Sequence, residues 1–175
     1  TVTIPENVIF VKHDASGLND GTSWENAYTD LSVALQYLIE NHLEGKNIWV
    51  AKGTYHPTDC PNLYGNCTSS REYHFTLMKG VTLYGGFNGD ENTLDQRDFL
   101  ANETVLSGDL NNDDTTSGNS ENSYHVFYHD GWEIKDNSAV LDGFTISGGN
   151  ANGDSWPNQE GGGIRNNENS DFGYG

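Results

Sequence analysis

The sequence has few basic residues. Lys and Arg together number 8, against 26 Asp and Glu, which gives a formal net charge of −18 over 175 residues. Nucleic acids and anionic membrane surfaces repel a chain of this charge, so the composition argues against both as partners. An acidic chain suits surroundings that contain salt or divalent cations, because closely spaced carboxylates repel one another unless they are screened or bound to metal.

Long apolar runs are also missing. Only 34% of the residues are hydrophobic, and no stretch approaches the ~20 apolar residues of a membrane-spanning helix. No signal peptide is visible at Thr1, so for an exported protein we expect the signal to have been removed already. Gly, with 21 residues, Asn and Asp are plentiful, which is rare in globular α/β enzymes and common in β-solenoids and other turn-rich all-β folds.

Cysteine is scarce, with two residues, Cys60 and Cys67. A disulfide between them closes a short loop easily and suits an oxidising compartment, so we predict that they are paired. Two free thiols are the alternative. A zinc site is not expected here, because the nearby His56 and His74 lack compact ligand spacing.

One segment, Thr29–His42, has the pattern of an amphipathic helix. Its apolar residues recur at positions i, i+3, i+4, i+7 and i+8, namely Leu31, Ala34, Leu35, Leu38 and Ile39. Thr29 is a suitable N-cap and Gly45 a suitable stop. We expect this helix to cover the open apolar end of a stack of strands.

A short motif, Leu-x-Gly, recurs at Leu83–Gly85, Leu106–Gly108 and Leu141–Gly143. A spacing of about two dozen residues is typical of one solenoid coil made of three short strands. The longer second spacing contains the polar residues 109–123, which we interpret as an insertion on one face. Glycine is expected at the corners, where the backbone takes positive φ.

These patterns predict an all-β solenoid, a right-handed parallel β-helix with an N-terminal amphipathic helix cap. Strands are expected over Val8–Val11, Ile48–Ala51 and Val81–Phe87. In this interpretation residues 1–47 form an N-terminal strand, a loop and the capping helix, and residues 48–175 form the first coils of the same folding unit. An antiparallel sandwich is the alternative, since strands of this length permit it.

Several short segments, in their order along the chain, carry a resemblance to a known family. They are Val11–Lys12, Asp14–Gly17, Asn19–Trp24, Ala27–Leu31, Ile48–Ala51, Gly53–Tyr55, Val81–Phe87, Leu94–Arg97, Leu106–Asp109, Asn122–His125 and Leu141–Ile146. Together they resemble the N-terminal part of bacterial secreted right-handed parallel β-helix surface proteins with the pectin-lyase-like fold. Gly161–Ile164 is also similar to repeats of polymorphic outer-membrane adhesins. The resemblance implies a secreted or cell-surface location in a bacterium and a longer parent chain.

The fold named by this resemblance hosts polysaccharide lyases, glycoside hydrolases and non-catalytic adhesins, so it does not decide the function. Lyases of this kind use an Arg or Lys base, but we interpret Arg97 as a salt-bridge former, and we assign no catalytic residue. We predict a non-catalytic extracellular scaffold or adhesin. Its expected partners are glycans, a host or neighbouring cell, and further copies bound through the open end of the solenoid. The alternative is a lyase or hydrolase with its active site in later coils.

The polar segment after Leu106 has the pattern of a calcium loop. Its oxygen donors, most of them on alternate positions, are Asp109, Asn111, Asp113 and Asp114. The segment departs from the EF-hand, because Asp114 stands where Gly belongs and Ser120 where the final Glu belongs. We therefore predict Ca²⁺ as a cofactor, with a solvated loop as the alternative. Asn88–Glu91 is a second, weaker candidate for a calcium site.

Four aromatic residues lie in or beside polar loops and are candidates for glycan contact. They are Tyr64, Tyr128, Trp132 and Trp156. Aromatic faces beside Asp and Asn suit stacking on sugar rings, although they also suit packing of a loop onto the body of the protein.

Overall fold

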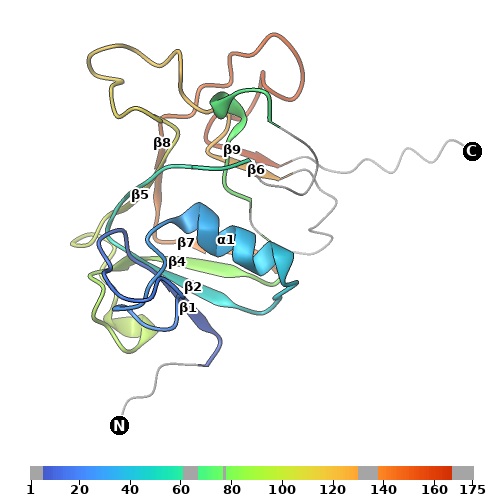
Figure 1. Cartoon of the computed structure of the whole chain (residues 1–175). Coiled ribbons are helices and arrows are strands. Elements are labelled where there is room, and N and C mark those ends of the chain that lie inside the picture. The colour runs from blue at the N-terminus through green and yellow to red at the C-terminus, as the bar shows by residue number, and fades with distance from the viewer. Residues whose placement is uncertain (1–5, 61–66, 77, 130–137, 167–175) are drawn as a thin grey trace, which may run out of the picture.

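The computed structural model describes residues 6–60, 67–76, 78–129 and 138–166. Within them lie the helix α1 and nine strands (Figure 1). Their bounds are β1 Val8–Val11, α1 Leu31–Glu40, β2 Asn47–Ala51, β3 Gly53–Tyr55, β4 Thr82–Phe87, β5 Thr104–Ser107, β6 Phe127–His129, β7 Val140–Asp142, β8 Thr145–Ser147 and β9 Ile164–Asn166, with short 3₁₀ helices at Ser70–Glu72 and Leu94–Gln96.

The paired strands are parallel and form three sheets. The strand orders are β1-β2-β4-β7, β3-β5-β8 and β6-β9. In the first sheet the apolar residues keep one register, since Ile48 lies opposite both Ile9 and Leu83, and Leu83 lies opposite Leu141. The strand candidates predicted from the sequence therefore become neighbours in one sheet.

The predicted all-β solenoid, a right-handed parallel β-helix, is wrong. The strands, each three to six residues long, form three separate small sheets, and a ten-residue helix shares their core, so the described chain has mixed α/β character. The Leu-x-Gly motif misled the prediction because its copies are not equivalent. Leu83 pairs with Leu141 in the first sheet, whereas Leu106 lies in the second sheet between Tyr55 and Ile146. The antiparallel alternative is wrong too, because the pairings are parallel.

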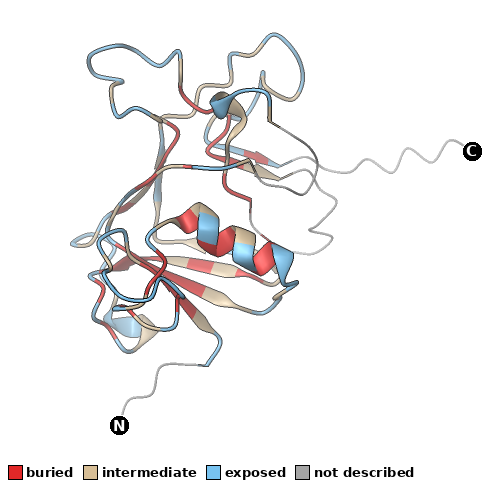
Figure 2. Cartoon of the chain, in the orientation of Figure 1, coloured by how far each residue is buried: buried red, intermediate tan, exposed pale blue. Residues whose placement is uncertain are grey.

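The predicted helix is confirmed, with shorter bounds of Leu31–Glu40. All five residues of its apolar stripe are buried, and they pack with the first sheet in the main core (Figure 2). Asp30, rather than Thr29, is the N-cap, because its Oδ1 accepts from Ser32 N at 2.7 Å. Thr29 is occupied elsewhere: its backbone N–H and its hydroxyl both bind Asn19 Oδ1.

The other face of the first sheet packs against the loop that follows β1. Phe10, Trp24, Trp49 and Phe87 form an aromatic cluster there, and Trp49 stacks on Phe87 with ring centroids 4.8 Å apart. Phe10 points to this cluster while its neighbours Ile9 and Val11 point to the main core, as the two-residue period of a strand requires. No helix in the described part of the chain has the length and apolar character needed to cross a membrane.

Candidate metal centre

The acidic loop, residues 109–123, leaves the end of β5 and returns beside it. Ser123 N donates to Gly108 O at 2.8 Å, which ties the two ends of the loop together. Asn150 N donates to Ser123 O at 2.8 Å and Asn122 Nδ2 to Gly148 O at 2.6 Å, so the loop also holds the chain that follows β8. In Figure 1 the loop (yellow) and the β8–β9 connection (orange) lie at the same end of the molecule.

Three carboxylates converge within this loop. Asp109, Asp113 and Glu121 each offer one oxygen, and these atoms all lie within 4.8 Å of one another. The backbone fixes Asp109, because its Oδ1 accepts from Asp113 N at 3.0 Å and its Oδ2 from Asp114 N at 3.3 Å. All three carboxylates are half-buried. Like charges this close repel one another, so the cluster could hold a metal ion that neutralises them.

Several side-chain oxygens of the same loop are buried without a hydrogen-bond partner. They are Asp113 Oδ1, Glu121 Oε1, Asn122 Oδ1 and Ser123 Oγ. Asn122 and Ser123 are 1% and 0% exposed, respectively. A buried oxygen without a donor is costly, and a carboxylate oxygen more so. The unpartnered carboxylate oxygens of Asp113 and Glu121, which belong to the cluster, therefore fit a bound cation better than a solvated loop.

The structure brings together half of the ligand set predicted from the sequence. Asp109 and Asp113 belong to the cluster, whereas Asn111 and Asp114 are exposed. Asp114 has another role, since its carboxylate accepts from Asn122 Nδ2 at 3.1 and 3.2 Å. Glu121 was missed because the twelve-residue EF-hand template ends one residue earlier, at Ser120.

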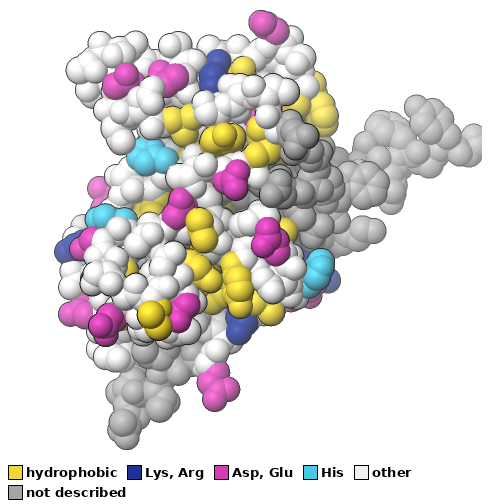
Figure 3. All heavy atoms as spheres, viewed as in Figure 1, with side chains coloured by type: hydrophobic (Ala, Val, Ile, Leu, Met, Phe, Trp, Pro, Cys, Tyr) yellow, Lys and Arg dark blue, Asp and Glu magenta, His cyan; other side chains and the backbone are white. Residues whose placement is uncertain are grey.

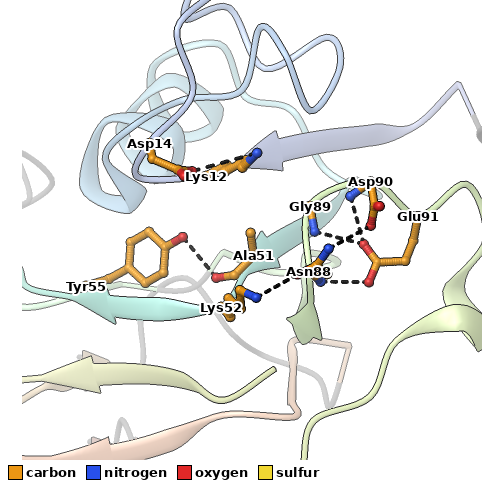
Figure 4. A network of polar contacts seen from close by, with 9 residues as sticks. All are labelled: Lys12, Asp14, Ala51, Lys52, Tyr55, Asn88, Gly89, Asp90 and Glu91. Atoms are coloured by element: carbon orange, nitrogen blue, oxygen red, sulfur yellow. Dashed lines mark hydrogen bonds and ion pairs between the residues drawn. The ribbon is translucent and has the colours of Figure 1, made fainter. Parts of the chain in front are cut away.

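In the second calcium candidate, Asn88–Glu91, the structure gives the Glu91 carboxylate another role. Glu91 is 7% exposed, and its carboxylate accepts from three successive backbone N–H groups, those of Asn88 at 2.7 Å, Gly89 at 2.9 Å and Asp90 at 3.1 Å (Figure 4). Lys52 Nζ donates to Asn88 Oδ1 at 2.7 Å. The chain's own N–H groups thus stabilise this carboxylate, as in an anion-binding nest.

Glu91→Gln is expected to lower the free energy of unfolding by about 2–3 kcal/mol, because the amide turns donor hydrogens toward N–H groups that need acceptors. Urea unfolding measures the change. The matched control is Asp90→Asn, an exposed neighbour, with a change of about 0.5 kcal/mol or less. Equal effects of the two substitutions would contradict the role given to Glu91.

The arginine and cysteine predictions are confirmed. Arg97 Nη2 lies 2.7 Å from Asp142 Oδ2, and its guanidinium lies over the ring of Tyr84. Cys60 and Cys67 form a disulfide, with sulfur atoms 2.07 Å apart. Both features are structural: the first joins two segments of the chain and the second closes a loop.

None of the family models, curated proteins or solved structures compared with the chain matches it. The resemblance to pectin-lyase-like surface proteins is therefore neither supported nor refuted, and it stays a prediction.

The aromatic candidates differ in exposure. Tyr64 and Trp132 lie outside the described residues. Tyr128 is half-buried, with the rings of His74 and His125 at 5.1 and 5.3 Å from its own, so packing explains its position. Trp156 is 61% exposed. Of the two described candidates, Trp156 is the one left open to a ligand.

Burial beside Tyr128 lowers the pKa of His74 to about 4, while its Nδ1 lies 2.8 Å from Glu72 O. The unfolded chain binds this proton near pH 6.5, so the stability from neutral His74 is complete above that pH and falls as the pH drops toward 4. The expected loss between pH 7 and pH 5 is about 2 kcal/mol.

Urea unfolding of the wild type and of His74→Phe at both pH values isolates this loss. The carboxylates, and His125 nearby, titrate in both proteins, whereas His74 titrates in one. An identical pH dependence in the two proteins would contradict the assignment.

Proposed function

We propose that this chain is a non-catalytic scaffold of an extracellular protein, that its acidic loop binds Ca²⁺, and that its surface contacts glycans. The observation that carries the proposal is the cluster of Asp109, Asp113 and Glu121 with its orphaned oxygens. A disulfide is compatible with an extracellular location.

The donor set favours calcium over other cations. Carboxylate, amide and hydroxyl oxygens are the ligands of hard cations, whereas zinc and copper sites in proteins use histidine or cysteine. Ca²⁺ accepts six to eight oxygens in irregular arrangements, while Mg²⁺ requires near-octahedral geometry. Three carboxylates that converge in an irregular loop suit the more tolerant ion.

The ion's proposed role is structural. Asp109 begins the acidic loop and Glu121 is near its end, so one cation bound by both would close the loop. The same loop donates from Asn122 to Gly148 O and accepts from Asn150, and it thereby fixes the β8–β9 connection. A metal ion here would stabilise this end of the molecule without taking part in a reaction.

The arginines support a non-catalytic role, since each has a structural partner. Arg71 Nε donates to Asn122 O at 2.8 Å, Arg97 pairs with Asp142, and Arg165 Nη1 lies 3.0 Å from Glu160 Oε2. A lyase needs a base free to take a proton from its substrate. Three arginines held in this way are not free to act as that base.

Incubation with acidic and neutral polysaccharides tests the proposal, with unsaturated and reducing-end products as the readout. We expect neither product from any of these polysaccharides. Release of either product by the purified chain, at a rate proportional to its concentration, would contradict the non-catalytic role.

A further inference from the structure

The β8–β9 connection carries an exposed tryptophan. Trp156 is 61% exposed, whereas Trp24 and Trp49 are 9% and 2% exposed within the aromatic cluster. A lone exposed aliphatic residue is common on protein surfaces, but a large, mostly exposed indole on a polar loop is a frequent feature of contact sites.

The loop presents this ring from a closed turn. Asn158 N donates to Ser155 O at 2.9 Å, which closes the four residues around Trp156. Gly153 N donates to Asn158 O at 2.8 Å and closes the wider loop. At the base of the loop, Arg71 Nη2 donates to Asn150 O at 3.0 Å. The turn is therefore held before any ligand arrives, which lowers the entropy cost of binding.

A buried arginine supports one side of the ring. The guanidinium of Arg165 lies 5.3 Å from the ring centroid of Trp156. Arg165 is itself 8% exposed and is paired with Glu160. An arginine fixed in this way holds the indole of Trp156 in place. The exposed part of that indole forms a platform on which a ligand can stack.

The surroundings of the platform select the class of ligand. Asp154, Gln159 and Glu160 are exposed on the same loop and offer hydrogen-bonding groups to hydroxyls. The carboxylate of Asp154, on a chain of net charge −18, repels anionic polymers, whereas that of Glu160 is paired with Arg165. Figure 3 shows acidic side chains spread over the face in view, with few basic ones.

We propose that Trp156 stacks on a pyranose ring of a neutral polysaccharide, with the exposed polar groups of the loop binding its hydroxyls. The proposal rests on the glycan contact in the proposed function and narrows it to one residue and one ligand class. In this proposal the sugar binds Trp156 and its loop without contacting the calcium ion.

Affinity electrophoresis tests it in gels that contain a mixed-linkage β-glucan, a galactomannan, polygalacturonate or alginate. We expect at least one neutral polymer to retard the wild type, Trp156→Ala to weaken that retardation about tenfold, and Trp156→Phe to retain most of it. Phe99→Ala is the matched control, since Phe99 is 55% exposed on another loop, and its retardation should equal that of the wild type.

Retardation by the acidic polymers alone, by none of the four, or equally in Trp156→Ala and the wild type would overturn the proposal. Circular dichroism of each variant checks that it folds. Calcium-dependent melting of Trp156→Ala separates the two claims. If Ca²⁺ raises the melting temperature of Trp156→Ala as it does that of the wild type, and its polysaccharide binding is unchanged, only the glycan site is contradicted. If Ca²⁺ does not raise the melting temperature of the wild type, only the calcium proposal is contradicted.

Discussion

Asp113→Asn is expected to abolish the rise in melting temperature that Ca²⁺ gives the wild type. At a free Ca²⁺ concentration of about 100 times Kd, binding stabilises the folded chain by about 2.7 kcal/mol. For a domain of this size, that corresponds to a rise of about 5–10 °C. The variant loses one charge of the three-carboxylate cluster and an oxygen that has no other partner.

In the presence of a chelator the order is expected to reverse, with Asp113→Asn melting above the wild type, because the substitution removes a half-buried charge that repels its neighbours. Asp114→Asn is the matched control. Asp114 is exposed and lies outside the cluster, so this variant should keep the calcium response. Loss of the response in Asp114→Asn and its retention in Asp113→Asn would favour the sequence-based ligand set over the structural one.

Leu83→Ala is expected to lower the free energy of unfolding by about 2–5 kcal/mol. Leu83 is 0% exposed and lies in β4 between Ile48 and Leu141 of the adjacent strands. Truncation removes its contacts with both neighbours and leaves a cavity in the core between the first sheet and α1. Equilibrium urea unfolding measures the change.

Leu141→Ala is the internal comparison, since Leu141 occupies the same register position one strand further along the sheet and is half-buried. Its truncation should cost less than that of Leu83, because part of the side chain already faces water. An equal or larger cost at Leu141 would mean that the core is centred elsewhere than between α1 and the first sheet.

Local patterns predicted the elements that depend on neighbouring residues. The helix Leu31–Glu40 follows from a stripe with a 3.6-residue period, and the disulfide Cys60–Cys67 follows from close spacing. The N-cap shifted by one residue because Asn19, distant in sequence, binds Thr29. That contact has no signature within the helix itself.

The arrangement of the sheets could not be obtained in this way. Leu83, Leu106 and Leu141 share a motif, yet the connections place the second of them in a different sheet. A three-residue motif reports an inward-facing leucine, while the choice of sheet depends on the length and path of the connections. The all-β solenoid prediction failed at this step.

The metal site, too, could be predicted from the sequence only in part. The alternation Asp109, Asn111, Asp113 pointed to the correct loop, but the chain turns at Asn112, with φ of 56°, and Asn111 remains exposed. Glu121 joins the cluster because Gly108 and Ser123 are hydrogen-bonded across the base of the loop. Only the folded loop reveals that contribution.

Isothermal titration calorimetry of the chelator-treated chain with CaCl₂ tests the central claim most directly. We expect one saturable site per chain that binds Ca²⁺ more tightly than Mg²⁺. The site should be absent in Asp113→Asn and present in Asp114→Asn. No saturable heat in the wild type, or the same heat in Asp113→Asn, would contradict this claim.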